Sequence, residues 1–89
     1  MFIIAYNKDN YCQFEGPAIS EYEEAFHRYT FLCQQLDFIK STKYLLKFGD
    51  STKTLDCKIN KDRLDYLTLF EFGCEAEPET EIIDFYFDL

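Results

Sequence analysis

Several residue types on which small enzymes depend are scarce in this sequence of 89 residues. Glycine occurs only at Gly16, Gly49 and Gly73, so the chain has no glycine-rich loop of the kind that holds phosphate groups. Histidine occurs once, at His27. A nucleophilic pair of this histidine with a cysteine would also need an orienting group and a cleft, which the sequence does not indicate. We therefore expect that the protein is not an enzyme.

Metal-binding patterns are equally sparse. The cysteines at positions 12, 33, 57 and 74 form no C-x-x-C motif and no short Cys–His spacing, which argues against a structural zinc site. An EF-hand loop that began at Asn60 would fail, because Leu64 stands at a ligand position and Asp65 where glycine is required. We expect no cofactor and no resident metal. Weak binding of a divalent cation by residues 75–81 is the alternative.

The chain also lacks long hydrophobic runs. No window approaches the roughly 18 apolar residues of a membrane span, and the apolar segment at residues 1–6 is too short for a signal peptide. Without export, disulfides are not expected, and an apolar content of 47% can form a core without them. We therefore expect a cytoplasmic protein with four free thiols, most of them buried.

The clearest local signal is an amphipathic helix over about residues 21–37. Ser20 and Glu23 have the spacing of a capping box, in which each side chain would bond an amide of the first turn. Aromatic and apolar residues then recur at spacings of four and three, as one face of a helix requires. This predicted stripe consists of Tyr22, Phe26, Tyr29, Cys33 and Leu36, widened by Ala25 and Leu32.

The other segments favour strands. Residues 1–6 and 11–15 flank a cluster of turn residues at 7–10, and residues 43–48 and 54–59 alternate around Gly49 as in a hairpin. Residues 60–63 form a polar connection that Asn60 can cap. We prefer a strand to a short helix for residues 64–74, and residues 82–89 alternate cleanly enough to be a strand docked in the sheet.

These elements predict a single α+β domain over residues 1–89. Its one main helix, at about 21–37, packs on a largely antiparallel sheet of about five or six strands. The length allows one core, and the ten phenylalanines and seven tyrosines supply much of it.

The charge is distributed very unevenly, because no basic residue follows Arg63. Residues 1–63 contain nine basic and nine acidic residues and are neutral, so the whole net charge of −8 belongs to the last 26 residues. Those 26 residues also carry many large apolar side chains, which a disordered acidic tail would lack. The acidic residues are therefore expected on folded structure.

The candidate partner-binding residues are the acidic residues that this stretch can display: Glu71, Glu75, Glu77, Glu79, Glu81, Asp84 and Asp88. Four of them repeat at every second position, which in an extended chain places them about 7 Å apart on one side. Phosphates of a DNA strand advance about 3.4 Å each, so this row could match alternate phosphates. Direct binding to nucleic acid or to an anionic membrane is not expected, because phosphate contacts need Lys and Arg.

We interpret the sequence as a small acidic inhibitor or interaction protein. Its C-terminal acidic surface would bind a basic, nucleic-acid-binding site on a partner protein, as a nucleic-acid mimic does. Phage anti-defence proteins such as anti-CRISPR proteins share this size and acidity, as do immunity proteins for nuclease toxins. The alternatives are an immunity or antitoxin protein, a structural subunit that assembles through an aromatic sheet face, and a solvated surface that only aids solubility.

Overall fold

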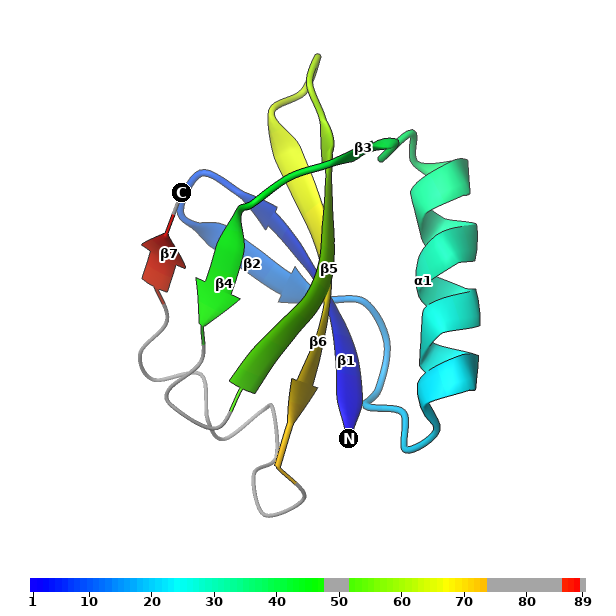
Figure 1. Ribbon diagram of the computed structural model, residues 1–89. Coiled ribbons are helices and arrows are strands. Elements are labelled where there is room, and N and C mark those ends of the chain that lie inside the picture. Colours follow the sequence, from blue (N-terminus) through cyan, green and yellow to red (C-terminus); the bar gives the residue numbers. More distant parts are fainter. Residues whose placement is uncertain (48–51, 74–85, 89) are drawn as a thin grey trace.

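The computed structural model describes residues 1–47, 52–73 and 86–88 (Figure 1). Five strands form an antiparallel sheet in the order β2-β1-β6-β5-β3, and two further strands, β4 and β7, form a separate antiparallel pair. The elements are β1 (Phe2–Lys8), β2 (Tyr11–Phe14), α1 (Tyr22–Gln35), β3 (Lys40–Ser41), β4 (Leu45–Lys47), β5 (Thr52–Asn60), β6 (Asp65–Phe72) and β7 (Tyr86–Asp88). The predicted α+β class, with one helix packed on an antiparallel sheet, is confirmed.

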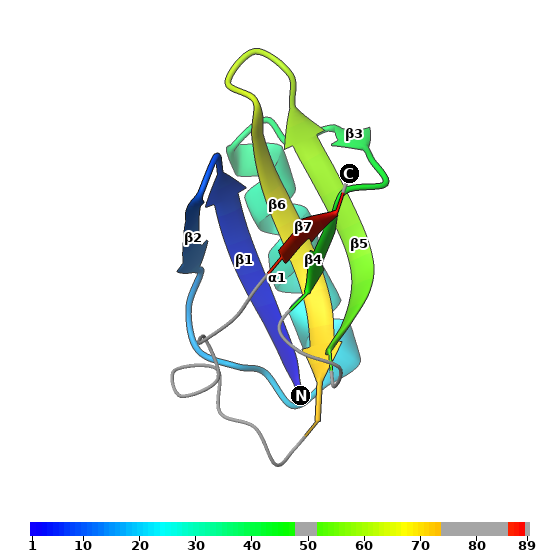
Figure 2. The ribbon, with the colours of Figure 1, turned by 90° about the vertical axis from the view of Figure 1, so that its left-hand side faces the viewer.

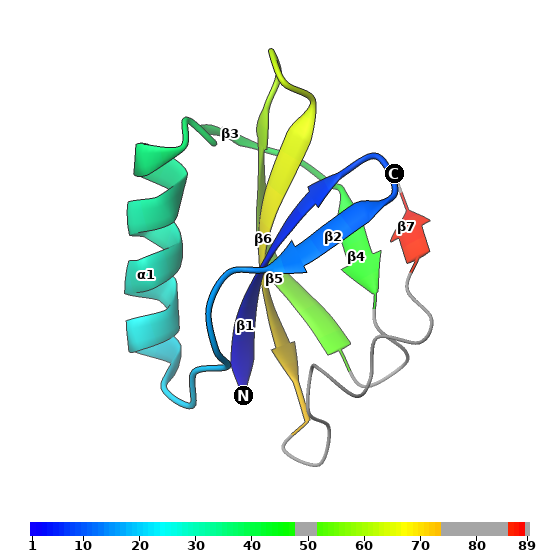
Figure 3. The same cartoon turned by 180° about the vertical axis from the view of Figure 1, so that it is seen from behind.

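The five-stranded sheet is covered on both faces. Figure 2 shows the β4–β7 pair in front of the sheet and α1 behind it, and Figure 3 shows the same layers from the back of Figure 1. The core on the helix side contains Ile4, Ala25, Tyr29, Cys33, Phe38, Leu67 and Leu69. The core on the β4 side contains Ile3, Ala5, Tyr44, Leu46, Cys57, Phe70 and Phe72. Strands β1 and β6 thus bury side chains on both faces.

The first hairpin forms as the sequence predicts, with a longer first strand. Strand β1 continues through Asn7 and Lys8, which still pair with β2, so the turn consists of Asp9 and Asn10 alone. Asp9 has a φ of +52°, in the left-handed region that Asp tolerates better than most residues.

The predicted capping box at the start of α1 is wrong. The N-cap is Glu21, with φ −98° and ψ 127°, and it makes no side-chain hydrogen bond to the first turn. The preceding chain explains the shift, because Ile19 exchanges two backbone hydrogen bonds of 2.8 Å with Phe2 of β1. This bridge holds the chain extended up to Ser20, and the helix begins two residues later.

The helix ends at Gln35, two residues earlier than predicted. The amide of Leu36 still donates to the carbonyl of Leu32 at 3.0 Å, and Asp37 then turns the chain at a φ of +60°. At 14 residues, α1 is not long and apolar enough to cross a membrane, and it is the only helix in the described part of the chain.

The predicted hairpin between residues 43–48 and 54–59 is wrong. Strand β5 pairs with β3 and β6, whereas β4 pairs with β7. The five-stranded sheet has apolar side chains on both faces, so the face opposite α1 must also be covered by another element. Tyr44 and Leu46 supply it, and the carbonyl of Leu46 accepts a hydrogen bond from the Thr54 hydroxyl at 3.2 Å. The expected turn at Gly49 lies outside the described residues.

The C-terminal half confirms two predictions and corrects one. Residues 65–72 form strand β6, and the Asn60 side chain caps the turn before it by accepting bonds from the amides of Asp62 and Arg63, each at 3.0 Å. Strand β7 exists at residues 86–88, but it pairs with β4 and does not join the five-stranded sheet. The rest of the predicted strand at 82–89 lies outside the described residues.

Candidate functional site

Of the seven candidate partner-binding residues, Glu71 and Asp88 lie in the described part of the structure. Glu71 is exposed near the end of β6, opposite Phe2 of β1 and Lys53 of β5. Asp88 belongs to β7, in which its backbone pairs with Leu45. The remaining candidates lie outside the described residues: Glu75, Glu77, Glu79, Glu81 and Asp84. Their role in binding stays a prediction.

Asp65 is the one acidic residue of the last 26 that is not a candidate, and the structure buries it to 1% exposure. Its Oδ2 atom accepts a hydrogen bond from the Tyr6 hydroxyl at 2.9 Å and pairs with Nε of Arg63 at 3.0 Å. Burial, followed by the hydrogen bond to Asp65, raises the pKa of the Tyr6 hydroxyl, since a phenolate there would face a carboxylate. The charge of Asp65 is therefore held inside the fold.

Arg63, the last basic residue of the chain, is engaged at the C-terminal end of α1. Besides its pair with Asp65, its Nη2 atom donates to the carbonyl of Leu36, and its guanidinium carbon lies 5.1 Å from the centroid of the Phe38 ring. Strand β6 separates this position from Glu71 by about 20 Å, at roughly 3.3 Å per residue. Arg63 thus neutralises the start of β6, whereas Glu71, near the far end, has Lys53 of β5 directly opposite it.

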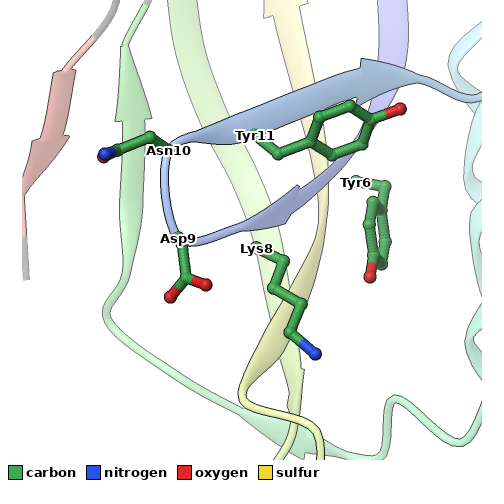
Figure 4. Close-up of a pocket in the computed structure, with 5 residues that line it drawn as sticks. All are labelled: Tyr6, Lys8, Asp9, Asn10 and Tyr11. Atoms are coloured by element: carbon green, nitrogen blue, oxygen red, sulfur yellow. The ribbon is translucent and has the colours of Figure 1, made fainter.

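A shallow hollow of about 590 Å³ lies beside the turn of the first hairpin (Figure 4). Tyr6, Lys8, Asp9, Asn10 and Tyr11 line it, and the two tyrosine rings meet edge to face with their centroids 6.4 Å apart. Lys8 and Asp9 add one charge of each sign. These five side chains include neither a histidine nor a cysteine.

The described cysteines are free thiols in unreactive surroundings. Cys33 and Cys57 are buried and Cys12 is partly buried. Burial raises the pKa of all three thiols, to about 11 for Cys57, so they are protonated and weakly nucleophilic at neutral pH. His27 is exposed on α1, and the described residues contain no group of three His, Cys, Asp or Glu side chains placed to hold a metal ion.

An aromatic patch lies at the N-terminal end of α1, and we define it as Phe2, Tyr22 and Phe26. The Tyr22 and Phe26 rings are stacked, with centroids 5.8 Å apart and an interplanar angle of 29°. Phe2 of β1 meets Tyr22 edge to face at 5.5 Å. Tyr22 is 48% exposed and Phe26 is 44% exposed. The two rings therefore stack as aromatic rings do in a core, but both face solvent.

Acidic residues border this patch on two sides. Glu23 lies three residues before Phe26 on α1, which makes the two side chains neighbours on the helix surface. Glu71 lies directly opposite Phe2, and directly paired residues of a sheet share one face. Lys53 faces Glu71 from β5, but the ion pairs among the described residues are Lys58–Asp56 and Arg63–Asp65. The patch border therefore carries two carboxylates, and the cations on the side of Glu71 are Lys53 and the N-terminal ammonium, which donates to the carbonyl of Phe72 at 3.2 Å.

The sequence interpretation missed this patch, because it placed Tyr22 and Phe26 in the buried stripe of the helix. The structure buries only the next positions of that stripe, Ala25, Tyr29 and Cys33, against the sheet. The first turn of α1 instead faces Phe2, which is itself only partly buried. Three glutamates within four residues of these rings were the available signal, because such charge density is unusual in a buried turn.

These features define a small α+β protein with an acidic and aromatic surface at one end of its helix. Comparison with protein-family models, with curated proteins and with solved structures found no match for this chain. Its function is therefore inferred from its residues alone.

Proposed function

We propose that this protein is a small acidic interaction protein that inhibits its partner. Its C-terminal acidic residues bind a basic surface, and that surface is the nucleic-acid-binding site of the partner. The acidic side chains occupy the positions that phosphates take in the partner's normal ligand, so the protein competes with nucleic acid. Phage anti-defence proteins, including anti-CRISPR proteins, and immunity proteins for nuclease toxins are the classes to which this function belongs.

One observation carries the proposal: the whole net charge of −8 belongs to the last 26 residues, which contain no basic residue. Arg63, the nearest preceding cation in the sequence, is bonded to Asp65 and to the Leu36 carbonyl. Concentrated like charge costs folding free energy through self-repulsion, and a basic partner would relieve that cost. Solubility alone does not require the charge to be gathered in one stretch.

Binding of this kind has a characteristic dependence on salt. Opposite potentials steer the two proteins together, so association is fast at low ionic strength and slows as salt screens the charges. The Debye length falls from about 10 Å at 0.1 M to about 3 Å at 1 M salt. We therefore expect the partner to be captured at low salt and released by high salt or by DNA.

The test compares two variants with the same change in net charge. Glu77→Lys with Glu79→Lys reverses the centre of the acidic row, while Gln34→Lys, Gln35→Lys and Asp62→Lys change the net charge by the same amount at exposed sites elsewhere. Immobilised protein and each variant are used to capture partners from the natural host or infected cell. The captured partner is then purified, and its affinity is measured with and without competing double-stranded DNA.

The acidic-row variant should lose binding by at least tenfold, and the charge-matched control should lose much less. DNA should compete with the unmodified protein for the partner. Equal losses in both variants would show that only net charge matters, and an unaffected acidic-row variant would contradict the proposal directly. A partner that is a nuclease toxin of the same cell would identify an immunity protein.

A further inference from the structure

We propose that the aromatic patch is an anchor for an arginine side chain of the basic partner. In this arrangement the guanidinium stacks on the exposed faces of Tyr22 and Phe26 and pairs with the carboxylate of Glu23. The inference rests on the proposed function in one respect, since both assume a basic partner. It adds to the acidic row a second contact region, which consists of described residues.

The rings are preorganised for this role. Tyr22 and Phe26 already stack on each other, and Tyr22 is held from the sheet side by the edge-to-face contact with Phe2. They project from consecutive turns of a regular helix, so little side-chain freedom is lost when a ligand packs on them. Leaving two such rings 44–48% exposed costs the protein burial free energy, which a ligand would recover.

Charge complementarity identifies the occupant. Glu23 and Glu71 border the patch, and both are exposed and lack an ion-pair partner among the described residues. The cation of the same helix, Arg28, is six residues after Tyr22 and therefore lies on another side of α1, where its guanidinium packs against Gly16. A purely apolar partner would bury these carboxylates without compensation, whereas a cationic side chain neutralises them.

Arginine fits this surface better than lysine. Its guanidinium is planar and weakly hydrated, so it can stack on a ring and pair with a carboxylate in the same pose. The lysine ammonium is a compact and strongly hydrated charge, which gains less from an aromatic face. The patch therefore selects arginine-rich segments, which are common in proteins that bind nucleic acid.

The aromatic patch and the C-terminal end of β6 lie at the same end of the molecule. Figures 1 and 3 show the N-terminal end of β1, the first turn of α1 and the end of β6 together at the lower edge. The chain leaves β6 at Phe72 and enters the acidic residues 75–81 shortly afterwards. A single basic partner surface can thus meet both the patch border at Glu71 and the start of the acidic row.

The experiment uses two labelled peptides of equal length, oligo-arginine and oligo-lysine, with binding to the whole protein followed by fluorescence anisotropy at low salt. The unmodified protein should prefer the arginine peptide. The double variant Tyr22→Leu with Phe26→Leu should bind the arginine peptide about tenfold more weakly and lose the preference, since each exposed cation–π contact contributes a few-fold in affinity. Thermal unfolding checks that the double variant, and the control variant described next, are folded.

Phe31→Leu is the matched control, because Phe31 is 55% exposed on the same helix but lies about 180° around it from Tyr22. Its affinity for the arginine peptide should stay within about twofold of the unmodified protein. Equal affinities of the unmodified protein for the two peptides would overturn the proposal, and so would an equal loss in the Phe31→Leu control. A homodimer that the double variant dissociates would overturn it too, by assigning the patch to self-association.

The acidic-row variant Glu77→Lys with Glu79→Lys separates this inference from the proposed function. If it weakens both peptides more than the charge-matched control of Gln34→Lys, Gln35→Lys and Asp62→Lys does, and the arginine preference persists, both proposals hold. If it changes neither affinity while the preference persists, the proposed acidic row fails and the aromatic anchor stands. If it weakens both peptides and the unmodified protein shows no preference, the anchor fails and the acidic row stands.

Discussion

The two ends of helix α1 are built in opposite ways. At the C-terminal end the chain satisfies its own polar groups: Arg63 donates to the carbonyl of Leu36, and the Asn60 side chain donates to the carbonyl of Asp37 at 3.1 Å. At the N-terminal end, Glu21 caps the helix without a side-chain hydrogen bond, and the ring of Tyr22 is 48% exposed. We call the C-terminal end of α1, where Arg63 and Asn60 bond the last carbonyls, the closed end, and the N-terminal end, with Tyr22, the open end.

This difference suggests a division of roles. The closed end contains a buried carboxylate paired with Arg63 and a capped turn, so removing one partner of either should destabilise the folded state. The open end carries exposed rings and exposed carboxylates that form no ion pair with another described residue, so these side chains are accessible to a partner. Substitutions at the closed end should therefore change stability, while substitutions at the open end should change binding.

The largest effect is expected at Asp65, compared with Glu71 on the same strand. Asp65→Ala leaves the Tyr6 hydroxyl and the exposed Arg63 guanidinium without their acceptor, and the loss of these two hydrogen bonds to a charged group should cost about 3 kcal/mol of unfolding free energy. Glu71→Ala removes an exposed carboxylate and should change stability by less than about 0.5 kcal/mol. Urea unfolding of the two variants measures both values.

Similar losses for Asp65→Ala and Glu71→Ala would contradict the division between a closed and an open end. Asp65→Asn is a useful second variant, because it keeps the shape of the side chain and removes only the charge. Its stability should lie between those of the unmodified protein and Asp65→Ala.

A smaller effect is expected when the closed end loses only one hydrogen bond. Tyr6→Phe removes the hydroxyl that donates to Asp65, and it should lower the unfolding free energy by about 1 kcal/mol at pH 7. A hydrogen bond to a charged group is stronger than a neutral one, but Tyr6 is only partly buried, which reduces the effect. The variant keeps the ring contact with Phe38, at a centroid distance of 6.3 Å. Urea unfolding at a series of pH values gives the change directly.

The cost of Tyr6→Phe should also depend on pH. Because folding raises the pKa of this hydroxyl above its ordinary value of 10.0, its contribution to stability is complete below pH 10 and is lost as the pH rises through the raised pKa. The gap between the two proteins should therefore narrow in alkaline solution. Other groups with raised pKa values, such as Cys57, are present in both proteins and cancel in the comparison. A gap that widens with pH would show that folding lowers the pKa of the Tyr6 hydroxyl, which would contradict its burial beside Asp65.

Local patterns predicted most of the elements, and long-range packing decided the remainder. The period of the helix and the β-forming run at residues 65–72 are properties of a few neighbouring residues, and both elements were predicted correctly. The pairing of β4 was not, because it depends on how Tyr44 and Leu46 cover a face built largely from β1 and β6, which are distant in the sequence. Alternation alone predicts a strand but does not identify its neighbour.

The candidate site divides in the same way. The charge imbalance is visible in the sequence, and Glu71 is exposed as a binding residue must be. The engagement of Arg63 by Asp65 and the exposure of Tyr22 could not be read from residue spacing. Both depend on where α1 starts and ends against the sheet, and a shift of one or two residues at each end changes which side chains are buried.

The smallest predicted effect concerns the capping box that the sequence indicates at the open end. Because Ser20 lies outside the helix, Ser20→Ala should change the unfolding free energy by less than about 0.3 kcal/mol, whereas a formed cap would be worth about 1 kcal/mol. Asn60→Ala is the comparison at the closed end, where two amides and the Asp37 carbonyl lose their partner, and it should cost about 1–2 kcal/mol. Equal losses for the two variants in urea unfolding would mean that Ser20 does cap the helix in solution, and that the open end is less open than its geometry indicates.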